Sequence, residues 1–114
     1  MKQVKIANLI YKVSRKAGLT SDDGQLAYGI ISNGKQTIEL ETEFPSQDKY
    51  KEVVLHEVIH GVIDQYGIDN LITHENMEPI VSILARGLMQ VFQDNPDLVK
   101  ELFNGKATKS TNRR

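Results

Sequence analysis

Apolar and polar residues alternate along the first part of the chain, a pattern typical of strands. Residues 3–13 read QVKIANLIYKV, where valine, isoleucine and tyrosine are frequent and Asn8 offers a turn. This alternation predicts one or two short strands. A helix over residues 2–17 is the alternative, because the same apolar positions also approximate a helical stripe.

A second pair of β-rich runs predicts a hairpin. The runs cover residues 26–32 and 36–41 and flank Asn33-Gly34, a dipeptide typical of two-residue hairpin turns. We expect Gly34 to take the positive φ that a type I′ turn requires. In the second run, isoleucine and leucine alternate with threonine and glutamate. One face of this strand is therefore expected to be buried and the other wet.

After Pro45 the apolar residues recur at helical spacing. Ser46 is a suitable N-cap for a helix that runs to about Tyr66, and Gly67 is a suitable C′ stop. This predicted helix is long enough to carry a site on one face and core residues on another.

Two more helices are predicted downstream. Thr73 is expected to cap a helix over residues 74–93. Asn95 and Pro96 resemble an N-cap followed by proline at the first helical position, which opens a short helix to about Phe103. The polar, basic segment that follows is expected to be a flexible tail.

Composition restricts the chemistry that the chain can perform. The 114 residues contain no cysteine and carry a net charge of −1. Any metal must therefore be held by histidine and carboxylate, and nucleic acid is not an expected partner. The N-terminus lacks an uninterrupted apolar segment, and no apolar run approaches the roughly 20 residues that span a bilayer. We expect a cytoplasmic protein with no membrane partner.

The run HEVIH provides the strongest functional signal. It places His56 and His60 four residues apart, with Glu57 directly after the first histidine. On a helix, these imidazoles differ by about 40° around the axis and about 6 Å along it. Both can then reach one zinc ion, while Glu57 lies on the same flank as a base beside the metal. We expect one Zn²⁺ per chain.

The residues around the motif predict a core face beside the site. With His56 set at zero, one arc of about 200–340° collects apolar residues of the helix. They are Leu55, Val58, Ile59, Val62, Ile63 and Tyr66. The two histidines fall in the neighbouring arc together with Glu57 and Asp64.

A third ligand is expected from the next helix, because catalytic zinc usually takes three protein ligands. Glu78 sits at the edge of the apolar arc of residues 74–93, where it can face the first helix. Glu75 lies about 60° further out and also suits a first-turn carboxylate that favours the helix dipole. His74 is a further alternative ligand. We therefore predict ligation by His56, His60 and Glu78, with Glu75 and His74 as alternatives.

These motifs resemble those of the zincin metallopeptidases. More narrowly, three stretches resemble small phage and prophage proteins grouped with the ImmA/IrrE-type metallo-endopeptidases. They read YGIISNGKQTIELE, LHEVIHGVIDQYGID and EPIVSILARGLMQVFQDNPDL. The similarity runs in order over about residues 4–103. The HEVIH helix and the downstream glutamate are its specific part.

The resemblance implies a minimal zincin-like domain of the α+β class. A small antiparallel or mixed twisted sheet would pack on the motif helix, followed by a glutamate-bearing helix and a short C-terminal helix. One such domain is expected over residues 1–104, with a flexible polar and basic tail over 105–114. Larger family members cleave a repressor, so the implied substrate is a protein or peptide, such as a repressor or another regulator.

The predicted reaction is peptide-bond hydrolysis by a zinc-activated water with Glu57 as general base. Tyr28, His74 and Tyr66 are candidate hydrogen-bond donors to the transition state. The pattern does not rank them, although Tyr66 also falls in the core arc. The alternative function is a catalytically weak or inactive zincin-fold protein that binds a partner in a phage or prophage.

Overall fold

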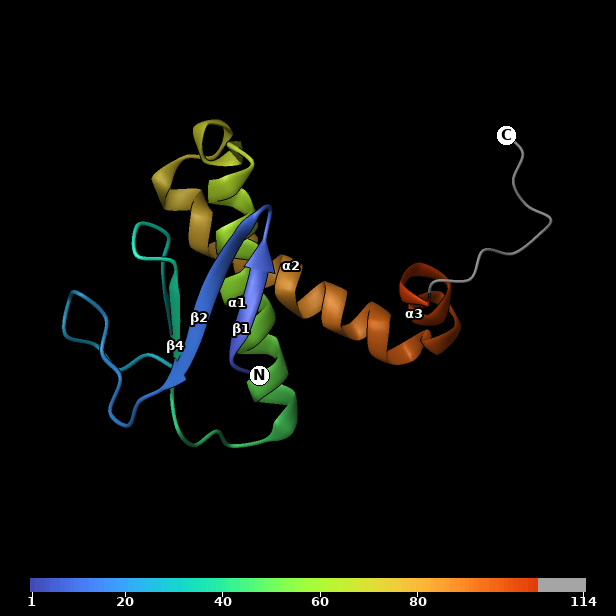
Figure 1. The fold of residues 1–114 in the computed structure, drawn as a ribbon, viewed down its shortest axis with the longest axis horizontal. Coiled ribbons are helices and arrows are strands. Elements are labelled where there is room, and N and C mark those ends of the chain that lie inside the picture. Colours follow the sequence, from blue (N-terminus) through green and yellow to red (C-terminus); the bar gives the residue numbers. More distant parts are fainter. Residues whose placement is uncertain (105–114) are drawn as a thin grey trace.

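The computed structural model describes residues 1–104 and has an α+β fold (Figure 1). One mixed sheet has the strand order β1-β2-β4-β3. The strands are β1 (Gln3–Ile6), β2 (Leu9–Arg15), β3 (Gly29–Ser32) and β4 (Thr37–Leu40). The helices of the described part are α1 (Gln47–Gln65), η1 (Ile68–Leu71, a 3₁₀ turn), α2 (His74–Asp94) and α3 (Pro96–Phe103). The tail predicted over 105–114 lies outside the described residues.

The first two strands form an antiparallel hairpin, which confirms the strand prediction and rules out the helical alternative over residues 2–17. The chain turns at Ala7 and Asn8, with Ala7 at a φ of 55°. Tyr11 of β2 is fully buried. Its hydroxyl donates to Asn33 Oδ1 at 2.7 Å and accepts from Gln65 Nε2 at 2.7 Å, so it joins the sheet to the end of α1.

Strands β3 and β4 form the second predicted hairpin, but the predicted turn is wrong. Ser32 pairs with Thr37, which leaves a four-residue loop over 33–36 in place of a two-residue turn. The residue with positive φ is Gln36, at 56°, and Gly34 has no such conformation. Loops of this length are usually built around a type I turn.

The sheet is mixed because β2 and β4 pair in parallel. Sequence alternation alone does not fix which strands become neighbours, and this pairing was not predicted. The order leaves β3 at one edge of the sheet, beside α1. One side of β3 therefore has main-chain groups that no strand of the sheet occupies.

Helix α1 begins and ends as predicted. The Ser46 side chain accepts a hydrogen bond from the Lys49 backbone N–H at 3.1 Å. Gly67 follows the C-cap residue Tyr66 with a φ of 76°, the left-handed conformation expected of a C′ glycine.

Helices α2 and α3 also begin at the predicted residues. Thr73 and Asn95 occupy the two N-cap positions, although neither side chain makes a capping hydrogen bond. Asn95 instead donates to the carbonyl of Val91, in the last turn of α2. The 3₁₀ turn η1 was not predicted.

Helix α1 is buried on two sides, where the sequence pattern predicted one core arc. Val53 joins a core cluster with the sheet residues Ile6 and Ile38, whereas Ile59 and Ile63 join a second cluster with α2. The apolar residues of α1 are therefore shared between two layers. Tyr66, assigned to the core arc, is 65% exposed.

Figure 1 shows α1 behind the sheet and α2 running from α1 towards α3 at the far end of the described chain. The first half of α2 packs on α1 through Val81 and Ala85, both of which are buried. Among the described helices, none is long and apolar enough to cross a membrane.

Candidate metal centre

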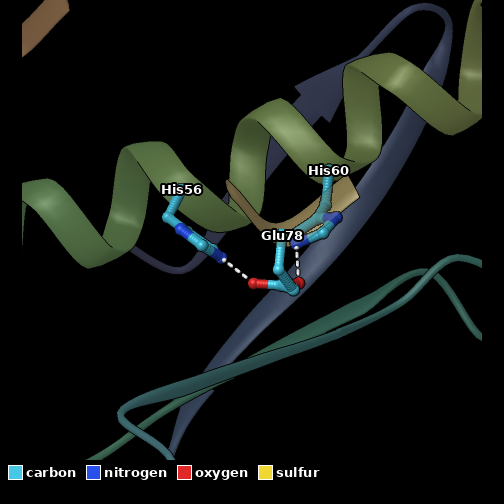
Figure 2. Close-up of polar contacts among 3 residues, drawn as sticks. All are labelled: His56, His60 and Glu78. Atoms are coloured by element: carbon cyan, nitrogen blue, oxygen red, sulfur yellow. Dashed lines mark hydrogen bonds and ion pairs between the residues drawn. The ribbon is translucent and has the colours of Figure 1, made fainter. Parts of the chain in front are cut away.

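The two histidines of the HEVIH run lie one turn apart on α1 and point in the same direction (Figure 2). Their ring centroids are 5.0 Å apart. Both side chains are largely covered, with exposed fractions of 20% for His56 and 17% for His60. The predicted convergence of the two imidazoles on one point is therefore present in the structure.

Glu78 of α2 faces both histidines (Figure 2). Its Oε1 lies 3.1 Å from His56 Nε2, and its Oε2 lies 2.7 Å from His60 Nε2. One nitrogen from each histidine and one Glu78 oxygen lie within 4.8 Å of one another. The Glu78 side chain is 67% exposed, so it is less buried than a residue at the edge of a core arc would be.

The donor set suits zinc. Two imidazole nitrogens and a carboxylate are standard zinc ligands, and two ligands of one tetrahedral zinc lie about 3.3 Å apart. The two nitrogen–oxygen distances of 3.1 and 2.7 Å are close to this separation. Burial lowers the pKa of His56, which favours the neutral imidazole that a metal requires. In the metal-free protein the same distances allow each histidine to form a hydrogen bond with Glu78.

Glu57 is buried where α1 packs against β3. It is 6% exposed, and the space beside it exists because residue 29 is glycine. A Cβ added at Gly29 would lie 3.0 Å from Glu57 Oε2 and 2.9 Å from Val53 Cγ1. Burial raises the pKa of the Glu57 carboxyl to about 7, and the Glu78 carboxylate contributes to the rise.

A pKa near neutrality suits a group that must both accept and release a proton at physiological pH. Although buried, Glu57 borders an open pocket that it lines with His56 and His60. The volume of this pocket is about 460 Å³, and β3 forms its opposite wall. Buried position, raised pKa and access to the cleft thus coincide in one carboxyl group.

A second pocket of about 250 Å³ adjoins the first. Both are lined by Gly29, His56 and Glu57, so these residues sit where the two pockets meet, whereas His60 and Glu78 line the larger pocket alone. One pocket extends along β3 as far as Asn33, and the other extends towards Tyr28. Together they form a cleft that follows the free edge of β3.

The remaining predicted site residues separate into two groups. Tyr28 lines the smaller pocket with His56 and Glu57, and its ring stacks on Phe44 at 5.2 Å. His74, Glu75 and Tyr66 are exposed and are not among the residues that line either pocket. The structure thus brings together His56, Glu57, His60, Glu78 and Tyr28.

Gly29 is the site residue that the sequence interpretation missed. It lies within an apolar strand pattern, where glycine often marks a close approach of another group to the backbone. Here the approaching group is Glu57. Ser82, one turn beyond Glu78 on α2, also lines the smaller pocket.

Comparison of the chain with protein-family models, curated proteins and solved structures gives no match. The interpretation of the site therefore depends on its own geometry.

Proposed function

We propose that this protein is a zinc-dependent metallopeptidase with a minimal zincin-like fold. The observation that carries the proposal is the convergence of His56, His60 and Glu78 within 4.8 Å, beside a buried glutamate in an open cleft. Two helices supply these groups, and both are fixed by packing on each other through buried residues. Such rigid support suits a site that must hold its geometry during a reaction.

His56, His60 and Glu78 would hold the ion. When bound, zinc supplies Lewis-acid chemistry, making a neighbouring water more acidic and a carbonyl group more electrophilic. Glu57 accepts the proton of the attacking water and passes it to the leaving amine. Its pKa of about 7 in the metal-free protein is compatible with both transfers.

The substrate class follows from the edge of the sheet. An extended peptide can pair with the free main-chain groups of β3 and so pass along the cleft over the three ligand candidates. Among the three predicted hydrogen-bond donors, Tyr28, directly before β3, is the one that lines this cleft. A protein or peptide substrate, such as a repressor or another regulator, therefore fits the cleft better than a small compact molecule.

The resemblance of the HEVIH helix and of Glu78 to the ImmA/IrrE-type metallo-endopeptidases supports the same proposal. Their reaction uses a helix with two histidines, a base between them and a glutamate from the following helix. The α+β fold, with the motif helix packed against a small mixed sheet, agrees with that arrangement.

Substitution Glu57→Gln tests the reaction. The zinc-loaded wild-type protein is incubated with a pool of randomised synthetic peptides, and the products are identified by mass spectrometry. The wild type is expected to cut peptides in this pool. Glu57→Gln should retain zinc and lose cleavage by at least about 100-fold, because a general base commonly contributes 10²–10⁴-fold. Cleavage that persists in Glu57→Gln would contradict the assigned role. Zinc binding without cleavage by the wild type would favour a binding protein instead.

A further inference from the structure

The smaller pocket beside the candidate metal centre carries two cations that have no acidic partner. Lys49 of α1 and Arg86 of α2 both line it, together with His56 and Glu57. Neither Lys49 nor Arg86 forms a salt bridge with another described residue. The Lys49 Nζ lies 5.6 Å from the centre of the Tyr28 ring, which holds it at the pocket wall.

The positions of the two cations relate simply to the metal ligands. Lys49 precedes His56 by seven residues, and Arg86 follows Glu78 by eight. Each cation therefore lies about two turns, or about 10–12 Å, along its own helix from a ligand. Glu78, Ser82 and Arg86 recur every four residues, so they share one face of α2. Two helices thus bring positive charge to the same end of the cleft.

The end of the cleft determines which part of a peptide running antiparallel to β3 would meet these cations. The smaller pocket lies at the Tyr28–Gly29 end of β3, and the larger pocket extends to Asn33. A peptide that pairs antiparallel to β3 has its C-terminal side at the Gly29 end. An extended peptide advances about 3.3 Å per residue. Side chains as long as those of lysine and arginine can therefore contact one of the first three residues after the bond that is cut.

We infer that Lys49 and Arg86 form a subsite for a carboxylate of the bound peptide, on the C-terminal side of the scissile bond. The inference rests on the proposed peptidase function and specifies its substrate. The carboxylate belongs either to an aspartate or glutamate side chain or to the end of the peptide. Glu52 also lines the pocket and offsets part of the positive charge. Its removal should therefore strengthen the selection of anionic peptides.

The test measures binding, so that it does not depend on turnover. Full-length, zinc-loaded Glu57→Gln protein is immobilised and exposed to two pools of randomised synthetic dodecapeptides, one with free C-terminal carboxylates and one amidated. Retained peptides are sequenced by mass spectrometry. In the retained peptides we expect aspartate and glutamate to be enriched about fivefold relative to asparagine and glutamine. One or two partly exposed ion pairs give a preference of this size. Enrichment in both pools identifies a side-chain carboxylate, and enrichment of the free-acid pool alone identifies the terminal one.

Charge reversal supplies the decisive comparison. Lys49→Glu and Arg86→Glu, each added to Glu57→Gln, should abolish the enrichment or change it to lysine and arginine, and Glu52→Gln should increase it. Lys51→Glu is the matched control, because Lys51 is exposed on the same helix and lines a different groove. Zinc content and circular dichroism verify that each variant is folded.

Several results would overturn the subsite. They are retention with no preference for acidic residues or for the free-acid pool, a preference that survives reversal at both cations, absence of any retained peptide, or acidic residues on the N-terminal side of cuts made by the wild type. Cleavage of the same pools by the wild type tests the proposed function separately. Cutting without acidic selection would contradict the subsite alone. Acidic selection without cutting would contradict the peptidase function and leave Lys49 and Arg86 as a site that binds anionic peptides.

Discussion

The Glu57 carboxyl is both buried in the fold and part of the candidate site. Its carboxyl is buried against Gly29 and yet opens to the cleft of the histidines. The place of Glu57 in HEVIH predicted its role. Its burial was not predicted, because Glu57 lies outside the apolar arc of the helix. Burial arises since α1 is covered by the sheet on that side, a tertiary effect that helical spacing does not contain.

The raised pKa of Glu57 predicts a pH dependence of the metal-free protein. Its folded pKa of about 7 exceeds the ordinary 4.5, so the folded state prefers the protonated form. The corresponding stability is fully present below pH 4.5 and is lost as the pH rises through 7. Across this window, the free energy of unfolding of the wild type should fall by about 3 kcal/mol relative to Glu57→Gln. Urea denaturation of both proteins without metal, at pH 5 and pH 8, measures the difference. Parallel pH profiles would contradict the burial of this carboxyl.

At the scale of elements, α1 holds the site because it is packed on both sides. Its ends were predictable, since Ser46 and Gly67 use local cap chemistry. The strands were also predictable from alternation. The parallel β2–β4 pairing and the loop over 33–36 were not, because they depend on residues far apart in the chain. Asn33, for example, accepts from Tyr11 instead of forming the tight turn that its sequence suggested.

Gly61 tests how closely α1 approaches the sheet. A Cβ at this position would lie 2.5 Å from Ile6 Cδ1, which belongs to the buried core. Gly61→Ala should therefore destabilise the protein by about 1–3 kcal/mol, the usual cost of overpacking. Gly87→Ala is the matched control on α2, where no atom lies within 4 Å of the added carbon. The control should stabilise by up to about 1 kcal/mol through helix propensity. Similar unfolding free energies for the two variants, measured in urea, would argue against a tight contact of α1 with the sheet.

At the scale of the whole molecule, the candidate metal centre joins two helices. The ligand candidates come from α1 and from the start of α2, with η1 and its flanking residues between them. The pair of histidines was predictable from spacing, and Glu78 was chosen over Glu75 by the helical wheel. The structure puts Glu78 beside both imidazoles and leaves Glu75 and His74 exposed. The open edge of β3 beside this centre could not be predicted, because it follows from the strand order.

A bound ion that bridges α1 and α2 should stabilise the folded protein. Zinc at 100 times its dissociation constant adds about 2.7 kcal/mol to the free energy of unfolding. Adding zinc should thus raise the melting temperature of the metal-free wild type, and a chelator should reverse the rise. His60→Ala should lose the shift, whereas His74→Ala should keep it. An equal shift in both variants, measured by differential scanning fluorimetry, would place zinc elsewhere on the protein.

The most direct test is the zinc content of the purified protein at equilibrium. Three proteins are dialysed against the same buffered low concentration of free zinc: the wild type, Glu78→Gln and Glu75→Gln. The zinc content per chain is then measured by inductively coupled plasma mass spectrometry. One ion per chain is expected in the wild type and in Glu75→Gln, with a clear loss in Glu78→Gln. A wild type that binds a negligible fraction of an equivalent, or a Glu78→Gln variant that binds as much as the wild type, would contradict a zinc centre formed by His56, His60 and Glu78.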